Sequence, residues 1–184
     1  FTRPIVALTS RMPLLQIRTP KIDKDVQLEL GLTEEFGFSR LPVCVDINVP
    51  DIGTVTIYVL HLKSKRASIL EVTYLENVSW QERSRDTLLR LSRGNITSLL
   101  QRGAESTLVY HSVSAELAPD AHKPIIVLGD LNDDPQSTTL AALTMQERVF
   151  SIGGIDSAFW PEGTGQYLHD YRLADTFRLA PNMR

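Results

Sequence analysis

The sequence predicts one domain of mixed strands and helices, in the α/β or α+β class. Runs of apolar and β-branched residues at 43–49, 54–60 and 124–129 are bounded by turn-forming residues, which is typical of strands. Between them, the stretch 80–117 contains no proline and repeats apolar residues at helical spacing. A chain of 184 residues is long enough for one globular domain with a sizeable core.

The composition excludes several classes of protein. A single cysteine, Cys44, cannot build an internal disulfide framework or a cysteine-based zinc cluster, and its place in an apolar run predicts a buried thiol. The net charge of −3 does not support a basic nucleic-acid clamp over the whole chain, but it allows a local basic patch. No apolar run approaches the ~20 residues that a membrane span requires. The sequence leaves localisation and oligomeric state open.

The N-terminal region predicts short strands joined by turns. The apolar run 5–8, followed by Pro13, has the length of a buried strand. The polar residues 21–25 predict a turn, and the alternation of apolar and polar residues over 26–30 predicts a half-buried strand.

A β-hairpin is predicted around the turn-forming residues 50–53. The run 43–49 alternates in its second half, and the run 54–60 is rich in β-branched residues. We therefore expect His61 at the far end of the second strand.

The stretch 80–117 predicts one long helix or two abutting helices, ended by Ala118, Pro119 and Asp120. We expect the charged residues of this stretch to form a solvated outer face.

The C-terminal region begins with the continuous apolar run 124–129, which is typical of a central strand covered on both faces. Asp130 follows at its carboxyl end. Ser137 is a good N-cap for a short helix over 137–146, and a strand or turn is predicted at 173–179.

Polar residues follow the predicted strand 54–60 in the segment His61-Leu62-Lys63-Ser64-Lys65-Arg66. An imidazole can exchange a proton near neutral pH, and the cations that follow it can hold an anion. The alternative is a histidine that caps a strand beside a solvated run of charges. Arg11 is a weaker candidate, able to bind a phosphate with two hydrogen bonds or to be an ordinary surface arginine.

A second polar segment, Gly129-Asp130-Leu131-Asn132-Asp133-Asp134-Pro135, follows the run 124–129. Carboxylates and an amide at a strand end can hold a hard cation such as Mg²⁺ or orient water. The alternative is a polar turn that caps the next helix, which is the role we expect for Asp133, Asp134 and Ser137.

A calcium-binding EF-hand loop is excluded for this segment. Asp130, Asn132 and Asp134 match the first, third and fifth positions of such a loop. The loop also requires Gly at its sixth position and Glu at its twelfth, where this chain has Pro135 and Ala141.

Taken in order, these segments resemble the endonuclease/exonuclease/phosphatase superfamily, the metal-dependent phosphohydrolases around deoxyribonuclease I and exonuclease III. The Gly-Asp-Leu-Asn element followed by Pro is the most specific part, and the order and separation of the segments add to it. The matching segments are Ser10-Arg11-Met12-Pro13, Tyr58-Val59-Leu60-His61-Leu62-Lys63-Ser64, Ile126 to Pro135, and Leu173-Ala174-Asp175-Thr176-Phe177-Arg178.

The resemblance implies a β-sandwich of two mixed sheets flanked by helices, and hydrolysis of phosphoester bonds with Mg²⁺ or Mn²⁺ and a water nucleophile. A nuclease or other phosphodiesterase is the most populated option. Carried over, Asp130 orients or deprotonates the water and binds the metal, and Asn132 holds the water or a phosphate oxygen. His61 contacts the scissile phosphate. The expected phosphate contacts are Arg11, Lys63, Ser64 and Lys65.

The departures from the family pattern matter as much. The pattern also has an Asn and a metal-binding Glu upstream of the segment matched here, and it ends with a Ser-Asp-His element that nothing after Asp175 supplies. We therefore expect residues 1–184 to be a single partial domain, incomplete at both ends, with the main metal ligand upstream of residue 1. Alternatives are an inactive member that serves as a binding module, and a phosphatase or phosphodiesterase for a small-molecule or lipid phosphoester. Nucleic acid is one candidate substrate.

Overall fold

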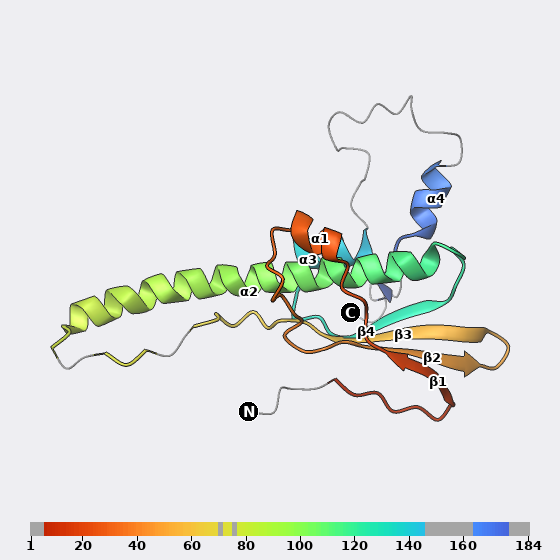
Figure 1. Cartoon of the computed structure of the whole chain (residues 1–184), viewed down its shortest axis with the longest axis horizontal. Helices are drawn as coiled ribbons and strands as arrows, with labels where there is room; N and C mark the ends of the chain where they lie inside the picture. Colours follow the sequence, from red (N-terminus) through yellow and green to blue (C-terminus); the bar gives the residue numbers. More distant parts are fainter. Residues whose placement is uncertain (1–5, 70–71, 75–76, 146–163, 177–184) are drawn as a thin grey trace.

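A computed structural model describes residues 6–69, 72–74, 77–145 and 164–176. These residues form one four-stranded mixed sheet and a long helix, so the α/β class is confirmed (Figure 1). The described residues contain no second sheet. They also contain no helix with the length and apolar character needed to span a membrane.

The sheet has the order β1-β2-β3-β4. β1 pairs antiparallel with β2, and β2 with β3, whereas β3 pairs parallel with β4. The four strands are β1 (Leu14–Arg18), β2 (Val43–Val49), β3 (Gly53–His61) and β4 (Ile125–Asp130).

The predicted hairpin is confirmed. β2 and β3 pair from Val43↔Val59 to Val49↔Gly53 without a register shift. Asp51 and Gly53 both have positive φ, at 65° and 92°, which an Asp and a Gly tolerate in a tight turn. His61 is the last residue of β3, as predicted.

The two faces of the sheet have separate apolar cores. Cys44, Tyr58 and Leu60 pack with residues of the long helix, and the prediction of a buried Cys44 thiol is confirmed. Val45, Ile57 and Val59 point to the other face, where the segment 6–12 contributes Val6, Leu8 and Met12. Period-two alternation along β2 and β3 separates these two sets of side chains.

The long helix α2 (Trp80–Leu117) is one continuous helix of 38 residues. Ser79 and Glu82 form a capping box at its start, and it ends before Ala118 and Pro119. Its C-terminal half packs against the sheet, and its N-terminal half extends beyond it (Figure 1). The expectation that its charges form a solvated face is wrong for Arg102 and Glu105, which are 4% and 1% exposed.

Two N-terminal predictions are wrong. Residues 6–8 of the expected strand 5–8 are not in a strand, because Val6 and Leu8 pack onto a face of the sheet instead of pairing at its edge. The expected strand 26–30 is instead the helix α1 (Lys24–Glu29), which begins inside the expected turn 21–25. The Asp23 carboxylate accepts hydrogen bonds from the N–H groups of residues 25 and 26, and this cap favours a helix.

The C-terminal predictions are partly confirmed. β4 forms as expected, but it lies at the edge of the sheet that the described residues form. The prediction of a central strand covered on both faces is therefore wrong for these residues, because Ile126 and Leu128 are 48% and 39% exposed. The helix α3 (Thr138–Thr144) forms with Ser137 as its N-cap. A further helix, α4 (Thr164–Asp170), was not predicted. Residues 173–175 form no strand, and residues 177–179 of that prediction lie outside the described residues.

Candidate functional site

A glycine sets the geometry of the site. Gly129 pairs with Leu60, and its φ of +129° lies in a region that other residues rarely adopt. A Cβ built on Gly129 would lie only 1.9 Å from the carbonyl oxygen of Leu60. The absence of a side chain therefore allows β4 to approach β3 closely enough for the next pair in register, His61 and Asp130, to lie side by side.

His61 and Asp130 face each other at the carboxyl ends of the two parallel strands. Their Nε2 and Oδ2 atoms are 3.7 Å apart, an ion pair when the imidazole is protonated. The side chains are 36% and 63% exposed, so both are accessible to a ligand from solvent. An imidazole and a carboxylate, two side-chain types that can transfer protons in catalysis, thus lie side by side on the protein surface.

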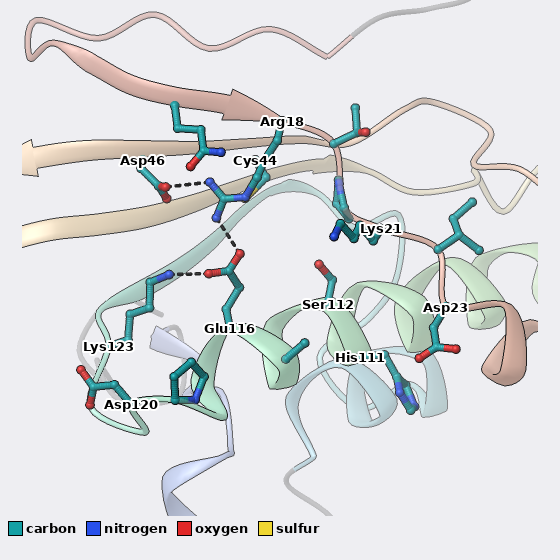
Figure 2. A pocket seen from close by; sticks show the side chains of 16 residues that line it. Arg18, Lys21, Asp23, Cys44, Asp46, His111, Ser112, Glu116, Asp120 and Lys123 are labelled. Carbon is teal, nitrogen blue, oxygen red and sulfur yellow. Dashed lines mark hydrogen bonds and ion pairs between the residues drawn. The ribbon is translucent and has the colours of Figure 1, made fainter.

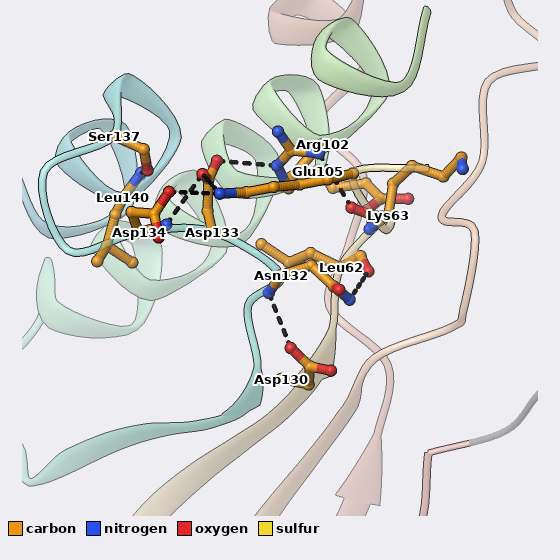
Figure 3. Close-up of polar contacts among 11 residues, drawn as sticks. Leu62, Lys63, Arg102, Glu105, Asp130, Asn132, Asp133, Asp134, Ser137 and Leu140 are labelled. Carbon is orange, nitrogen blue, oxygen red and sulfur yellow. Dashed lines mark hydrogen bonds and ion pairs between the residues drawn. The ribbon is translucent and has the colours of Figure 1, made fainter. Parts of the chain in front are cut away.

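Asn132 ties the end of β4 to the end of β3. It has a φ of 53°, in the left-handed region that Asn tolerates. Its backbone N–H donates to Oδ1 of Asp130 at 2.9 Å, and its Nδ2 donates to the carbonyl oxygen of Leu62 at 2.9 Å (Figure 3). The amide keeps its second N–H and its oxygen for other partners.

The loop after β3 lies across a cavity from this turn. The cavity has a volume of about 640 Å³, and it is lined by Ser64, Lys65 and Arg66 on one side and by residues 129–134 on the other. Two of the expected phosphate contacts, Ser64 and Lys65, therefore line the same cavity as Asp130 and Asn132. Lys63 does not line it, and its Nζ lies 3.4 Å from the carbonyl oxygen of Arg66.

Arg11 is not brought into this cavity. It precedes β1, which is the edge strand opposite β4, and the neighbouring Met12 packs against the far core of the sheet. The structure thus brings Ser64, Lys65, Asp130 and Asn132 to one cavity. His61 does not line this cavity but lies beside Asp130, and Arg11 lies apart from all of them.

Asp133 does more than cap a helix, contrary to our expectation. Its carboxylate is buried and accepts a hydrogen bond from Nε of Arg102 at 2.8 Å, and it lies 3.2 Å from Nζ of Lys65. Burial alone raises the pKa of this carboxyl, but the hydrogen bonds from Arg102, the N–H of Asp134, Lys65 and Thr139 outweigh it and lower the pKa to about 2. Asp134 also pairs with Lys65. Both acids therefore hold the lysine that lines the cavity.

Two residues that sequence reasoning missed, Arg102 and Glu105, contact this region from α2 (Figure 3). The spacing contained a signal for them. Counting back from the buried Val109 by helical steps of three and four reaches Glu105, Arg102 and Ser98, which are all buried. Charged residues on the apolar stripe of a helix are candidates for buried hydrogen-bonded roles.

The donor chemistry fits a hydrated magnesium ion. The described residues contain no group of three or more His, Cys, Asp and Glu side chains that could hold a metal. Mg²⁺ is commonly bound through one or two carboxylates and keeps several waters, so it does not need such a group. The exposed carboxylate of Asp130, with the amide oxygen of Asn132 nearby in sequence, supplies oxygen ligands of the kind it prefers.

A larger cavity, of about 1030 Å³, lies between the β1–β2 edge and the C-terminal part of α2 (Figure 2). Four of its charged side chains bind one another: Arg18 donates to Asp46 and to Glu116 at 2.7 Å each, and Lys123 also binds Glu116. Burial raises the pKa of both carboxyls, but these hydrogen bonds lower it overall. We assign this cluster a structural role, because it joins β1, β2 and α2.

The chain matches no family model, no curated protein and no solved structure.

Proposed function

We propose that this domain hydrolyses phosphoester bonds with the help of Mg²⁺, as a member of the endonuclease/exonuclease/phosphatase superfamily. The observation that carries the proposal is the pairing of His61 with Asp130 at the ends of two parallel strands. Asn132, Ser64 and Lys65 line the same cavity as Asp130. These residues belong to the segments on which the resemblance rests.

The two oxygens of the Asp130 carboxylate have different surroundings. One carboxylate oxygen is fixed by the N–H of Asn132, and the other faces His61 and solvent. Asp130 would hold the metal and orient the attacking water. Mg²⁺, when bound, supplies positive charge to the phosphoryl oxygens and makes a bound water more acidic.

His61 and Asn132 act as donors to the phosphoryl group. When its imidazole is protonated, His61 can donate a hydrogen bond to a phosphoryl oxygen while it faces Asp130. The second N–H of the Asn132 amide, which Leu62 leaves available, can do the same. Charge on the oxygens in the transition state is thereby stabilised.

Ser64 and Lys65 form the anion-binding side of the cavity. Lys65 bears a positive charge held in place by Asp133 and Asp134. A phosphate that enters the cavity lies between this ammonium and the pair of donors at the strand ends. Phosphoester substrates other than nucleic acid fit this arrangement equally well, because only one phosphate is bound by it.

The two-sheet sandwich is also proposed for this domain. Its support is the far face of the sheet, where the apolar core around Val45 and Ile57 continues to Ile126 and Leu128 at the β4 edge. Both of these side chains remain substantially exposed, and the segment 6–12 covers only part of the face. A second sheet packed there would bury them.

The test uses full-length protein and its Asp130→Asn variant with single-stranded DNA, double-stranded DNA, RNA and an aryl phosphodiester. We expect Mg²⁺-dependent turnover that chelator abolishes and that falls by about a thousandfold in the variant. Asp51→Asn is a matched control, because Asp51 lies in the exposed β2–β3 turn with a φ of 65°, which Asn tolerates. Turnover that survives both chelator and Asp130→Asn would refute the mechanism.

The second candidate function is a phosphate-binding module without turnover. It is favoured by a single observation, that Asp130 is the one carboxylate at the carboxyl ends of β3 and β4. In that case, full-length protein would bind inorganic phosphate or an oligonucleotide in equilibrium titrations, and no product would form with any of the four substrates.

A further inference from the structure

We propose that Arg102 and Glu105 of α2 are positioning residues that hold the loop after β3 in place against the phosphoryl group. The inference rests on the proposed function and assigns roles within that site to two residues that do not touch the cavity themselves.

Both backbone polar groups of Lys63 are bound by these two side chains (Figure 3). The N–H of Lys63 donates to Oε2 of Glu105 at 2.7 Å, and Nη1 of Arg102 donates to the carbonyl oxygen of Lys63 at 3.3 Å. The last backbone hydrogen bond to β4 is made one residue earlier, from the N–H of Leu62 to the carbonyl oxygen of Asp130. Side chains of α2 thus replace strand pairing at the point where the sheet ends.

The carbonyl oxygen of Leu62 is held just as closely. It accepts hydrogen bonds from Nδ2 of Asn132 at 2.9 Å and from Nη1 of Arg40 at 3.1 Å. Every backbone polar group of residues 62 and 63 therefore has a partner. The chain leaves β3 in one fixed direction, toward Ser64 and Lys65.

Glu105 is a buried carboxylate with an unusually full set of donors. Besides Lys63, it accepts hydrogen bonds from the N–H and the hydroxyl of Ser39, both at 2.6 Å, and from Nε2 of Gln101 at 3.0 Å. Its exposure is 1%. An apolar residue would fill this space without the cost of burying a charge, so packing does not explain the carboxylate. Its hydrogen bonds specify where two loops lie.

Arg102 connects the two sides of the site. The guanidinium that binds Lys63 on one side donates through Nε to Asp133 on the other, and Asp133 in turn holds Lys65. One planar group thereby sets the spacing between the loop after β3 and the turn after β4. A lysine at this position would have one ammonium in place of the planar guanidinium. It could not bind the carbonyl oxygen of Lys63 and the carboxylate of Asp133 in the same geometry.

The same face of α2 continues to guide the loop. Ser98 donates from its hydroxyl to the carbonyl oxygen of Arg66 at 2.6 Å, and the N–H of Ser68 donates to the carbonyl oxygen of Gly94 at 3.0 Å. A Cβ at Gly94 would lie 2.7 Å from the carbonyl oxygen of Ser68. Residues spaced by three and four along one helix face therefore contact the loop from residue 63 to residue 68.

The experiment compares full-length wild-type protein with Glu105→Gln, Arg102→Lys and a control, Val113→Ala. Gln turns one oxygen of Glu105 into an NH₂ group, which then opposes the N–H of Ser39 or of Lys63. Val113 is fully buried on α2 and belongs to the apolar core, so its truncation destabilises the fold without touching the loop. For each protein, Tm, kcat, KM and the hydrogen exchange of the Lys63 amide are measured.

We expect kcat to fall by about 10-fold to 100-fold in Glu105→Gln and by less in Arg102→Lys, because small displacements of positioned groups cost this much. The Lys63 amide should exchange faster in Glu105→Gln, and Val113→Ala should lower Tm while leaving kcat and this amide unchanged. If Glu105→Gln does not fold, the inference is tested with Arg102→Lys alone, by its Tm, kcat, KM and the hydrogen exchange of the Lys63 amide.

Two results would overturn the inference. One is unchanged hydrogen exchange of the Lys63 amide in both Glu105→Gln and Arg102→Lys. The other is a loss of kcat no larger than Val113→Ala shows for the same loss of Tm. Wild-type protein without turnover on any substrate defeats the proposed function and with it the catalytic part of the inference. In that case, the exchange of the Lys63 amide still decides whether α2 holds the loop, so the two failures are distinguishable.

Discussion

The helix α2 contributes to two charged clusters that use the same residue types in different ways. In the cluster around Arg18, side chains bind side chains, and Asp46, Glu116 and Lys123 neutralise one another. In the cluster beside the strand ends, Arg102 and Glu105 bind the backbone of a loop. The first arrangement joins elements together. The second holds a segment of chain in a fixed position and leaves Asp130 and His61 open to solvent.

The presence of charged residues in a cavity is therefore a weak guide to function. The larger cavity contains more charged residues, but the four of its Arg18 cluster are bound to each other. The smaller cavity is lined by the Asp130 carboxylate, which lies beside the His61 imidazole, and the contacts of both groups leave them accessible to solvent. The difference can be tested by substitutions that affect stability at one cluster and activity at the other.

The largest effect on stability is expected for Gly129→Ala. The new Cβ would meet the carbonyl oxygen of Leu60 at 1.9 Å, and φ would be strained as well, so we expect unfolding to become easier by about 3 kcal/mol or more. Urea denaturation measures this change.

Gly31→Ala is the matched control for Gly129→Ala. It has a positive φ of +68° but no atom within 4 Å of the added Cβ, so it isolates the backbone cost, about 1 kcal/mol. Equal losses in the two variants would contradict the close approach of β3 and β4.

The next largest effect is expected for Arg18→Met. Asp46 and Glu116 then lose a shared cation at a largely buried site, and we expect a loss of about 2 kcal/mol. The kcat of the folded protein should stay unchanged, in contrast to Asp130→Asn, which should lose activity and keep its Tm. If Arg18→Met lowers kcat in fully folded protein, the two clusters are functionally coupled and the division drawn here is wrong.

Acid should lower the stability of the fold by protonating Asp133, which binds Arg102 and Lys65. Because the folded pKa of about 2 lies below the ordinary value of 3.8, the ionised carboxyl stabilises the fold at pH values above 3.8, and this stabilisation is lost as pH falls toward 2. The shift corresponds to about 2 kcal/mol at neutral pH.

The measurement for Asp133 is the unfolding free energy of wild type and Asp133→Asn between pH 2 and pH 7. The difference between them should shrink by this amount as pH falls to 2. A difference that does not change with pH would show that Asp133 is not held as an ion.

The smallest effect on stability is expected for Lys65→Met. Its ammonium is half exposed and its pair with Asp134 is exposed, so that pair contributes little to stability. Asp133 keeps the hydrogen bond from Arg102 when Lys65 is replaced, so Tm should fall only slightly. If Lys65 binds the phosphate, KM should rise by about 10-fold with the phosphodiester substrate. Unchanged KM would remove Lys65 from the site and leave it as a partner of the two acids.

The sequence predicted the parts of the fold that depend on strong local patterns. β2, β3 and α2 have periodic or β-branched runs, β4 has a continuous apolar run, and clear turn or cap residues bound them, so each was predicted. α1 was mistaken for a strand because five alternating residues fit either structure, and the cap by Asp23 decided between them. Position within the sheet was not predictable for β4, because its exposure depends on partners that the local pattern does not contain.

The candidate site shows the same division. The positions of His61 and Asp130 at strand ends, and of Asn132 in the turn that follows, could be predicted because strand ends follow from local sequence. Their roles in a site stay predictions. Arg102 and Glu105 were dismissed because a charged residue on a helix usually faces water. Their burial depends on contacts with loops that are far away in sequence, at Ser39, Lys63 and Asp133.

The parallel pairing of β3 with β4 has a consequence for the order of folding. Leu62 and Asn132, which close the site, are 70 positions apart, and α2 lies between them in the chain. The β2–β3 hairpin closes a short loop and can form within microseconds. Docking of β4 beside β3 closes a far longer loop, which has a larger entropic cost. His61 is therefore in its strand before Asp130 arrives beside it. In a refolding experiment, hairpin signals should recover early, and any activity should return only with the last step, when β4 docks beside β3.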